Sequence, residues 1–129
     1  MKKERFMDKY EIFSLELLKS EITQTNIAEI MDYFKEKVDA HPVAKFVGTF
    51  DHYTHTKSID GPIMEGIIDA QCFMFCFGPA IPHHKILAVR PRIIGICEFE
   101  DKFTIDFTEA PKEVLHELME TWAKSIVNK

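Results

Sequence analysis

The sequence lacks the features that mark several large classes of proteins. Lysine and arginine form no basic block, and the formal net charge is −5. Because neutralising phosphates requires clustered basic residues, we expect no nucleic-acid partner. No apolar run approaches the ~20 residues of a membrane-spanning helix, and no apolar stretch of signal-peptide type follows the opening residues. We therefore expect a soluble, cytoplasmic protein with no membrane partner.

Cysteine is scarce, and catalytic motifs are missing. The chain has three cysteines and no Cys-x-x-Cys pair. An odd count in a chain of this length is typical of an intracellular protein without disulfides. There is no Gly-x-Ser-x-Gly elbow and no glycine-rich phosphate loop. Nucleophilic catalysis thus has little support, and the sequence leaves open whether the protein is an enzyme and which cofactor, if any, it uses.

What is present suits one globular domain over residues 1–129. The composition is 46% hydrophobic and 29% charged, which is enough to bury a core. The most informative stretch is 70–78, which is apolar throughout. Side chains alternate across a strand, so Phe73, Phe75 and Phe77 share one face. The opposite face then carries Cys72, Met74 and Cys76.

The N-terminal half predicts a strand, a helix and a second strand. Residues 1–9 are charged, and we expect them to be frayed. Residues 10–22 alternate as a strand does, although Leu17-Leu18 leaves a helix open as the alternative. Asn26 is placed to cap a helix that ends before Pro42. Residues 43–57 are expected to form the second strand, and 58–70 a connection that includes a short helix capped by Asp60.

The C-terminal half predicts a hairpin followed by a helix. Residues 85–99 are expected to be extended with an interruption at Pro91, and residues 102–109 return after a turn at Glu100-Asp101. This register pairs Ile96 with Ile105 and places an entirely apolar face toward the helices. The last helix begins after Pro111. The fold class is therefore α+β, a two-layer sandwich. It has a mainly antiparallel sheet of about five strands and two main helices on one face. The element order is β-α-β-β-β-β-α, broadly ferredoxin-like.

Metal binding is not expected from the cysteine and histidine spacing. Cys72 and Cys76 would be separated by roughly 13 Å along a strand, because each residue rises ~3.3 Å. One zinc ion cannot bridge that distance. His52 and His55 would point to opposite faces of their strand. The simpler interpretation is that the thiols are small buried hydrophobes.

Arg90-Pro91-Arg92 is the most suggestive basic feature. Both guanidinium groups would emerge on one side of an extended chain and could hold a carboxylate or phosphate. The alternative is a structural ion pair, because Arg92 would face Glu109 across the hairpin.

The sheet face away from the helices is the expected functional surface. It is too apolar to face water and too polar for an ordinary core. We expect it to bind a small organic or anionic ligand, to be a homodimer interface, or both. The alternatives are a small enzyme that uses Asp51, His55 or Asp106 as acid or base, and a structural or partner-binding domain. The candidate ligand-binding residues are Asp51, Tyr53, His55, Cys72, Met74, Cys76, Arg90, Gly95, Cys97 and Asp106.

Overall fold

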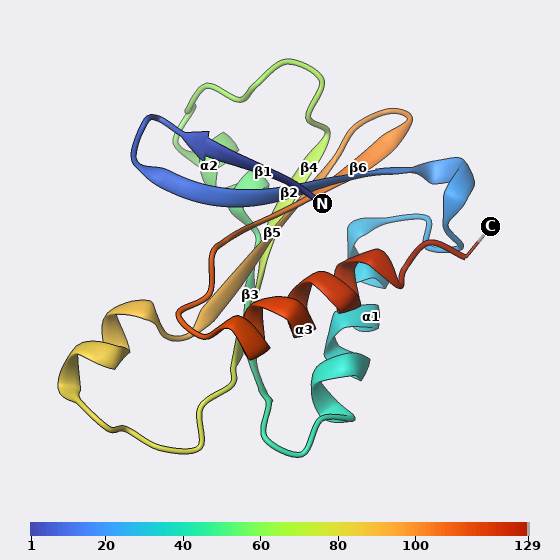
Figure 1. The fold of residues 1–129 in the computed structure, drawn as a ribbon. Helices are drawn as coiled ribbons and strands as arrows, with labels where there is room; N and C mark the ends of the chain where they lie inside the picture. Colours follow the sequence, from blue (N-terminus) through green and yellow to red (C-terminus); the bar gives the residue numbers. More distant parts are fainter. Residues whose placement is uncertain (129) are drawn as a thin grey trace.

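The computed structural model describes residues 1–128 and shows an α+β fold built on one antiparallel sheet (Figure 1). The six strands lie in the order β1-β2-β6-β5-β4-β3, and every neighbouring pair is antiparallel. The strands are β1 (Lys2–Phe6), β2 (Tyr10–Leu18), β3 (Lys45–Phe50), β4 (Asp69–Cys76), β5 (Arg92–Glu98) and β6 (Lys102–Thr108). The helices are α1 (Ile27–Asp39), α2 (His52–Ser58) and α3 (Glu113–Lys124), with 3-10 segments η1 (Lys19–Glu21) and η2 (His84–Val89).

The predicted class is confirmed, and the predicted detail is not. The protein is α+β with an antiparallel sheet, but residues 1–128 form six strands and three helices instead of about five and two. The strand order does not confirm the ferredoxin-like comparison. Among the helices of residues 1–128, none is both long and apolar enough to cross a membrane.

The hydrophobic core lies between one face of the sheet and the helices α1 and α3. Phe73 and Phe75 on β4 are fully buried there. The Phe73 ring lies 5.8 Å from Phe34 of α1, and the Phe75 ring lies 5.5 Å from Trp122 of α3. Both helices therefore cover the same face, as Figure 1 shows. The Tyr33 hydroxyl also donates a hydrogen bond of 2.7 Å to the Trp122 carbonyl, which joins the two helices.

Two predicted local features form as the sequence indicates. The Asn26 side chain accepts a hydrogen bond of 2.9 Å from the Glu29 N–H, so α1 begins where its cap predicts. The β5–β6 hairpin pairs Ile96 with Ile105, which is the predicted register. This register brings the apolar sides of both strands to the helix-covered face.

Residues 1–9 are not frayed, contrary to expectation. Lys2–Phe6 forms the edge strand β1 and pairs with β2. The connecting turn places both Met7 and Asp8 at φ 56°, and the Lys9 N–H donates to the Phe6 carbonyl at 3.1 Å. Such hairpin turns are usually marked by Asn or Gly. Because this turn contains neither, the sequence pattern did not reveal it.

Two segments predicted as strand are helical. The strand predicted at residues 43–57 ends at Phe50, because Asp51 caps α2 by accepting a hydrogen bond of 2.9 Å from the Thr54 N–H. Within 85–99 only the portion from Arg92 is a strand. Residues 84–89 form η2, since the His83 ring nitrogen accepts the Lys85 N–H at 3.1 Å and starts a turn. The helix expected at Asp60 does not form.

Replacing Phe75 tests the assignment of the sheet faces. Phe75→Ala removes a fully buried ring that packs on Trp122. The free energy of unfolding should fall by about 3–5 kcal/mol, as it does for large aromatic truncations in cores. Val47→Ala at an exposed site on β3 is the control and should cost less than about 0.5 kcal/mol. Denaturant melts of both variants measure the difference. Equal losses would contradict the assigned core face.

Candidate functional site

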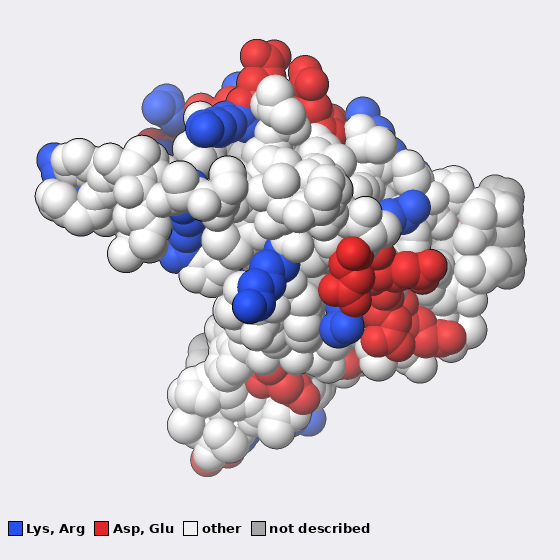
Figure 2. All heavy atoms as spheres, turned by 90° about the horizontal axis from the view of Figure 1, so that it is seen from below, with Lys and Arg blue, Asp and Glu red and all other residues white. Residues whose placement is uncertain are grey.

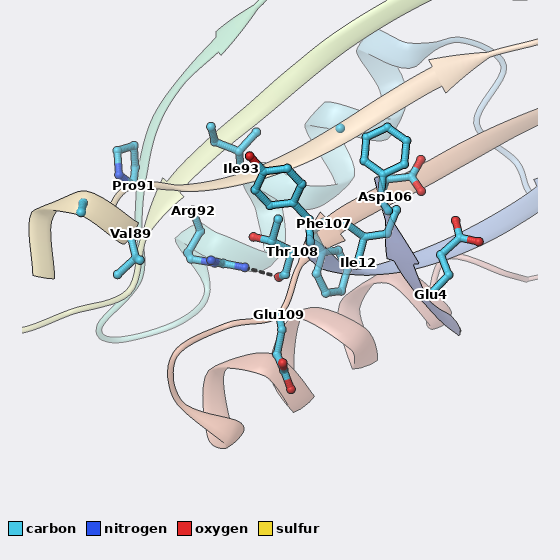
Figure 3. Close-up of a pocket in the computed structure, with 14 residues that line it drawn as sticks. Glu4, Ile12, Val89, Pro91, Arg92, Ile93, Asp106, Phe107, Thr108 and Glu109 are labelled. Carbon is cyan, nitrogen blue, oxygen red and sulfur yellow. Dashed lines mark hydrogen bonds between the residues drawn. The ribbon is translucent and has the colours of Figure 1, made fainter. Parts of the chain in front are cut away.

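A groove of about 900 Å³ lies on the sheet face opposite α1 and α3. Strands β5 and β6 form its floor, the β1–β2 hairpin bounds one side and η2 bounds the other (Figure 3). Its wall is mainly apolar, with polar groups at a few places. The apolar members include Phe6, Tyr10, Ile12, Val89 and Ile93, and the polar members are Glu4, Arg92, Asp106, Thr108 and Glu109.

Two of the ten predicted site residues line this groove. Gly95 and Asp106 are directly paired across β5 and β6 on its floor. The four sulfur-containing candidates Cys72, Met74, Cys76 and Cys97 lie on the same sheet face by their register, but none of them lines the groove. Six of the ten predicted residues therefore share the open sheet face, and two of these six line the groove.

Asp51, Tyr53 and His55 are not on the sheet face. They lie at the start of α2, which Figure 1 shows at the far end of β3, away from α1 and α3. His52 and His55 were expected to point apart, but one helical turn brings their ring centroids to 6.1 Å. The Phe50 ring lies within 5.6 Å of both imidazoles. The three predicted residues thus lie outside the groove, and only His55 is part of the ring cluster with Phe50 and His52.

Arg90 lies in the loop after η2 and does not reach the groove. Its Nη1 donates a hydrogen bond of 2.7 Å to the Ala80 carbonyl. It lines a second, more enclosed cavity of about 510 Å³ between this loop and the beginning of α3. Val89 and Arg92 line both spaces, so the two adjoin each other.

Asp106 is the acidic group of the groove with the most perturbed environment. Burial raises the pKa of its carboxyl above the usual value, and the nearby Glu4 charge raises it further. A hydrogen bond from the Ser14 hydroxyl acts in the opposite direction. The groove therefore has an acidic end at which a proton is held more tightly than on an exposed aspartate.

Arg92 is the basic group of the groove, and its expected partner does not pair with it. The side chain is only 6% exposed and donates one hydrogen bond, to the Thr108 carbonyl. Figure 3 shows the Glu109 carboxylate pointing away from it, and within residues 1–128 no carboxylate lies in ion-pair distance. The predicted cross-strand ion pair is wrong. Burial lowers the pKa of Arg92, but a guanidinium stays charged.

The thiols of Cys72 and Cys97 stand in surroundings that favour the protonated form. Burial raises the pKa of both Cys72 and Cys97. A protonated thiol is a poor nucleophile and a poor metal ligand. In the described part of the chain, no three His, Cys, Asp or Glu residues are grouped so that they could hold a metal ion.

Sequence reasoning missed the residues contributed by the N-terminal hairpin. Glu4, Phe6 and Tyr10 line the groove only because β1 folds back on β2. The sequence signal for this hairpin was the pair of aromatic residues Phe6 and Tyr10, which flank a three-residue segment and face each other across the two strands. Arg92 was not predicted as a groove residue, because the hairpin register placed it opposite Glu109 and suggested an ion pair.

The pH dependence of stability tests the environment of Asp106. Because its pKa is raised in the folded state, the folded protein binds this proton more tightly than the unfolded chain. The contribution of Asp106 to stability therefore falls as pH rises from the unfolded value of about 3.9 through the folded pKa. Asp106→Asn keeps an acceptor for Ser14 and removes the ionisation. We expect the melting temperature of this variant, relative to the original protein, to rise across that window.

Asp101→Asn, in the exposed turn before β6, is the matched control for this measurement. Its melting temperature relative to the original protein should change less over the same pH range. If Asp106→Asn and Asp101→Asn show the same profile, the buried environment of Asp106 has no energetic consequence.

Comparison with known proteins gives one assignment. No curated protein and no solved structure matches the chain. A family model does match, and it covers residues 1–128. The match therefore includes every strand of the sheet, both walls of the groove and helix α3. The chain belongs to DUF6858, a family of unknown function.

Proposed function

We propose that the protein binds a small, mainly apolar organic molecule in the groove on the open sheet face. The groove carries this proposal, because its volume of about 900 Å³ lies within the usual range for small-molecule sites. Ile12, Val89 and Ile93 provide apolar walls. Apolar walls with a few fixed polar groups are the usual composition of such sites.

The polar groups give the groove a direction. Arg92 lies at one end, and Asp106 and Glu4 lie at the other (Figure 3). A ligand with a hydrogen-bond acceptor at one end and a donor at the other would match this arrangement. The sheet between them presents the bare backbone of Gly95, where a ligand can approach closely.

A small enzyme that uses the same groove is the second candidate. The observation that favours it is the raised pKa of Asp106, since acid–base catalysis requires a carboxyl whose protonation changes nearer neutral pH. Asp51 and His55 are not part of this candidate, because they lie on α2. Asp106 would act alone or with Glu4.

Filling the groove from its floor tests ligand binding. A Cβ on Gly95 would meet only the Asp106 carbonyl at 3.5 Å, which is ordinary contact, so a larger side chain fits the strand. Gly95→Leu should place its side chain in the groove. We expect the fluorescence enhancement of a neutral apolar dye such as Nile red to require at least about tenfold more protein than with the original chain.

Gly48→Leu is the matched control. Gly48 lies on the same sheet face beside Met74, outside the groove, and a Cβ there meets nothing within 4 Å. Dye binding should be unchanged in this variant. Loss of binding in both variants, or in neither, would contradict a site at the groove.

We also propose that the protein forms a homodimer through the open sheet face. Phe6, Tyr10 and Ile93 on that face are each about half exposed. Contiguous apolar surface of this kind on a protein commonly marks an interface. Light scattering at micromolar concentration should give a mass of about 30 kDa, twice the 15.0 kDa of one chain. A mass of one chain across the concentration series would contradict the dimer.

A further inference from the structure

The second cavity has a composition that the groove does not share. It occupies about 510 Å³ between residues 77–79, η2 and the first turn of α3. Three basic residues, Arg90, Arg92 and Lys112, contribute to its wall. The other residues that line it are apolar or glycine, and no acidic residue of the described chain is among them. The cavity is therefore apolar and positively charged at once.

Arg92 supplies a buried cation that lacks a counter-charge. A guanidinium has five N–H donors, and only one hydrogen bond from Arg92 is formed within residues 1–128. Its Nε is buried and has no hydrogen-bond partner in the described part of the chain. Burying a charge is unfavourable unless it is paired and hydrogen-bonded. An anion in the cavity that Arg92 lines would compensate this charge.

The beginning of α3 adds a second positive element at the same place. Pro111, Lys112, Val114 and Leu115 line the cavity, and α3 has 12 residues. Lys112 stands at the N-cap position and makes no side-chain cap hydrogen bond. The first N–H groups of a helix attract anions when they lack such a cap. The helix start and the guanidinium of Arg92 therefore both favour an anion, although Glu113 in the same first turn weakens the contribution of the helix start.

Residues 77–79 form the side of the cavity opposite α3, and they contact Arg90. The Arg90 guanidinium donates a hydrogen bond to the Ala80 carbonyl and lies against the backbone of Gly78. A Cβ built on Gly78 would overlap this guanidinium, so a larger residue there would displace the end of the Arg90 side chain. Figure 2 shows that the left-hand lobe, which holds η2, is largely uncharged, while a large group of acidic side chains lies to its right. No acidic patch on this view covers the lobe.

We infer that the second cavity binds an organic carboxylate with an apolar body. The carboxylate would lie against Arg92 and the start of α3, and the apolar body would contact Phe77, Ile86 and Leu115. A planar guanidinium matches a carboxylate in a two-point hydrogen bond. This cavity adjoins the groove, because Val89 and Arg92 line both, but Phe77, Ile86 and Leu115 line the cavity and not the groove.

The experiment compares charged and neutral probes on the complete protein. Benzoate and octanoate are titrated by calorimetry, with benzamide and octanamide as neutral counterparts of the same shape and inorganic phosphate as an anion without an apolar body. The carboxylates should bind and raise the melting temperature, because a ligand that binds only the folded state stabilises it. The amides and phosphate should do so at least about tenfold more weakly.

Val114→Glu places a negative charge at the cavity without disturbing the core, since Val114 is 71% exposed in the first turn of α3. A carboxylate there also suits a helix start. Affinity for benzoate should fall about five- to tenfold through like-charge repulsion. Val114→Gln, with the same shape and no charge, should keep the affinity. Arg92→Gln should abolish binding, and the Val114 pair remains informative if that variant does not fold.

Ile93→Gln tests whether benzoate binds in the groove instead, because Ile93 lines the groove and not the second cavity. It should leave benzoate affinity unchanged. The inference is overturned if the amides bind as well as the carboxylates, or if phosphate binds as well as they do. It is also overturned if Val114→Glu has no effect on affinity, or if Ile93→Gln weakens binding more than Val114→Glu does.

Discussion

Burial of one sheet face under α1 and α3 is the constraint on which the other features of this protein depend. Phe73 and Phe75 on β4 contact Phe34 and Trp122, which belong to different helices. Because strand side chains alternate, this contact directs the other side chains of the sheet away from the helices. The open face, with its half-exposed apolar residues and its groove, is the consequence.

Arg92 lies at the beginning of β5, where the buried face of the sheet stops. It follows the alternation that places Ile94 and Ile96 in the core, so its side chain is buried as theirs are. At the end of the sheet, however, it meets the Thr108 carbonyl and no carboxylate within the described residues. A buried cation without a partner is costly. The groove and the second cavity both adjoin this residue.

Much of the fold could be predicted because it depends on patterns within a few residues. The alternation around Phe75, the Asn26 cap and the apolar match of Ile96 with Ile105 all form as expected. The site was less predictable. Gly95 and Asp106 could be placed on the groove face by counting along a hairpin, whereas Tyr53 and His55 could not, because the cap at Asp51 ends the strand just before them.

The sequence by itself thus determined helix α1, the β5–β6 hairpin and the buried side of the central strands, because each of these follows from local periodicity. Only the tertiary structure decided where on the open sheet face the groove lies. Its walls come from β1 and η2, which reach β5 and β6 through pairing and packing between segments far apart in the chain. The turn that brings β1 back uses two positive φ angles at Met7 and Asp8. Asp tolerates this conformation better than most residues, whereas Met does not, so the pairing of β1 with β2 helps to hold Met7 in it.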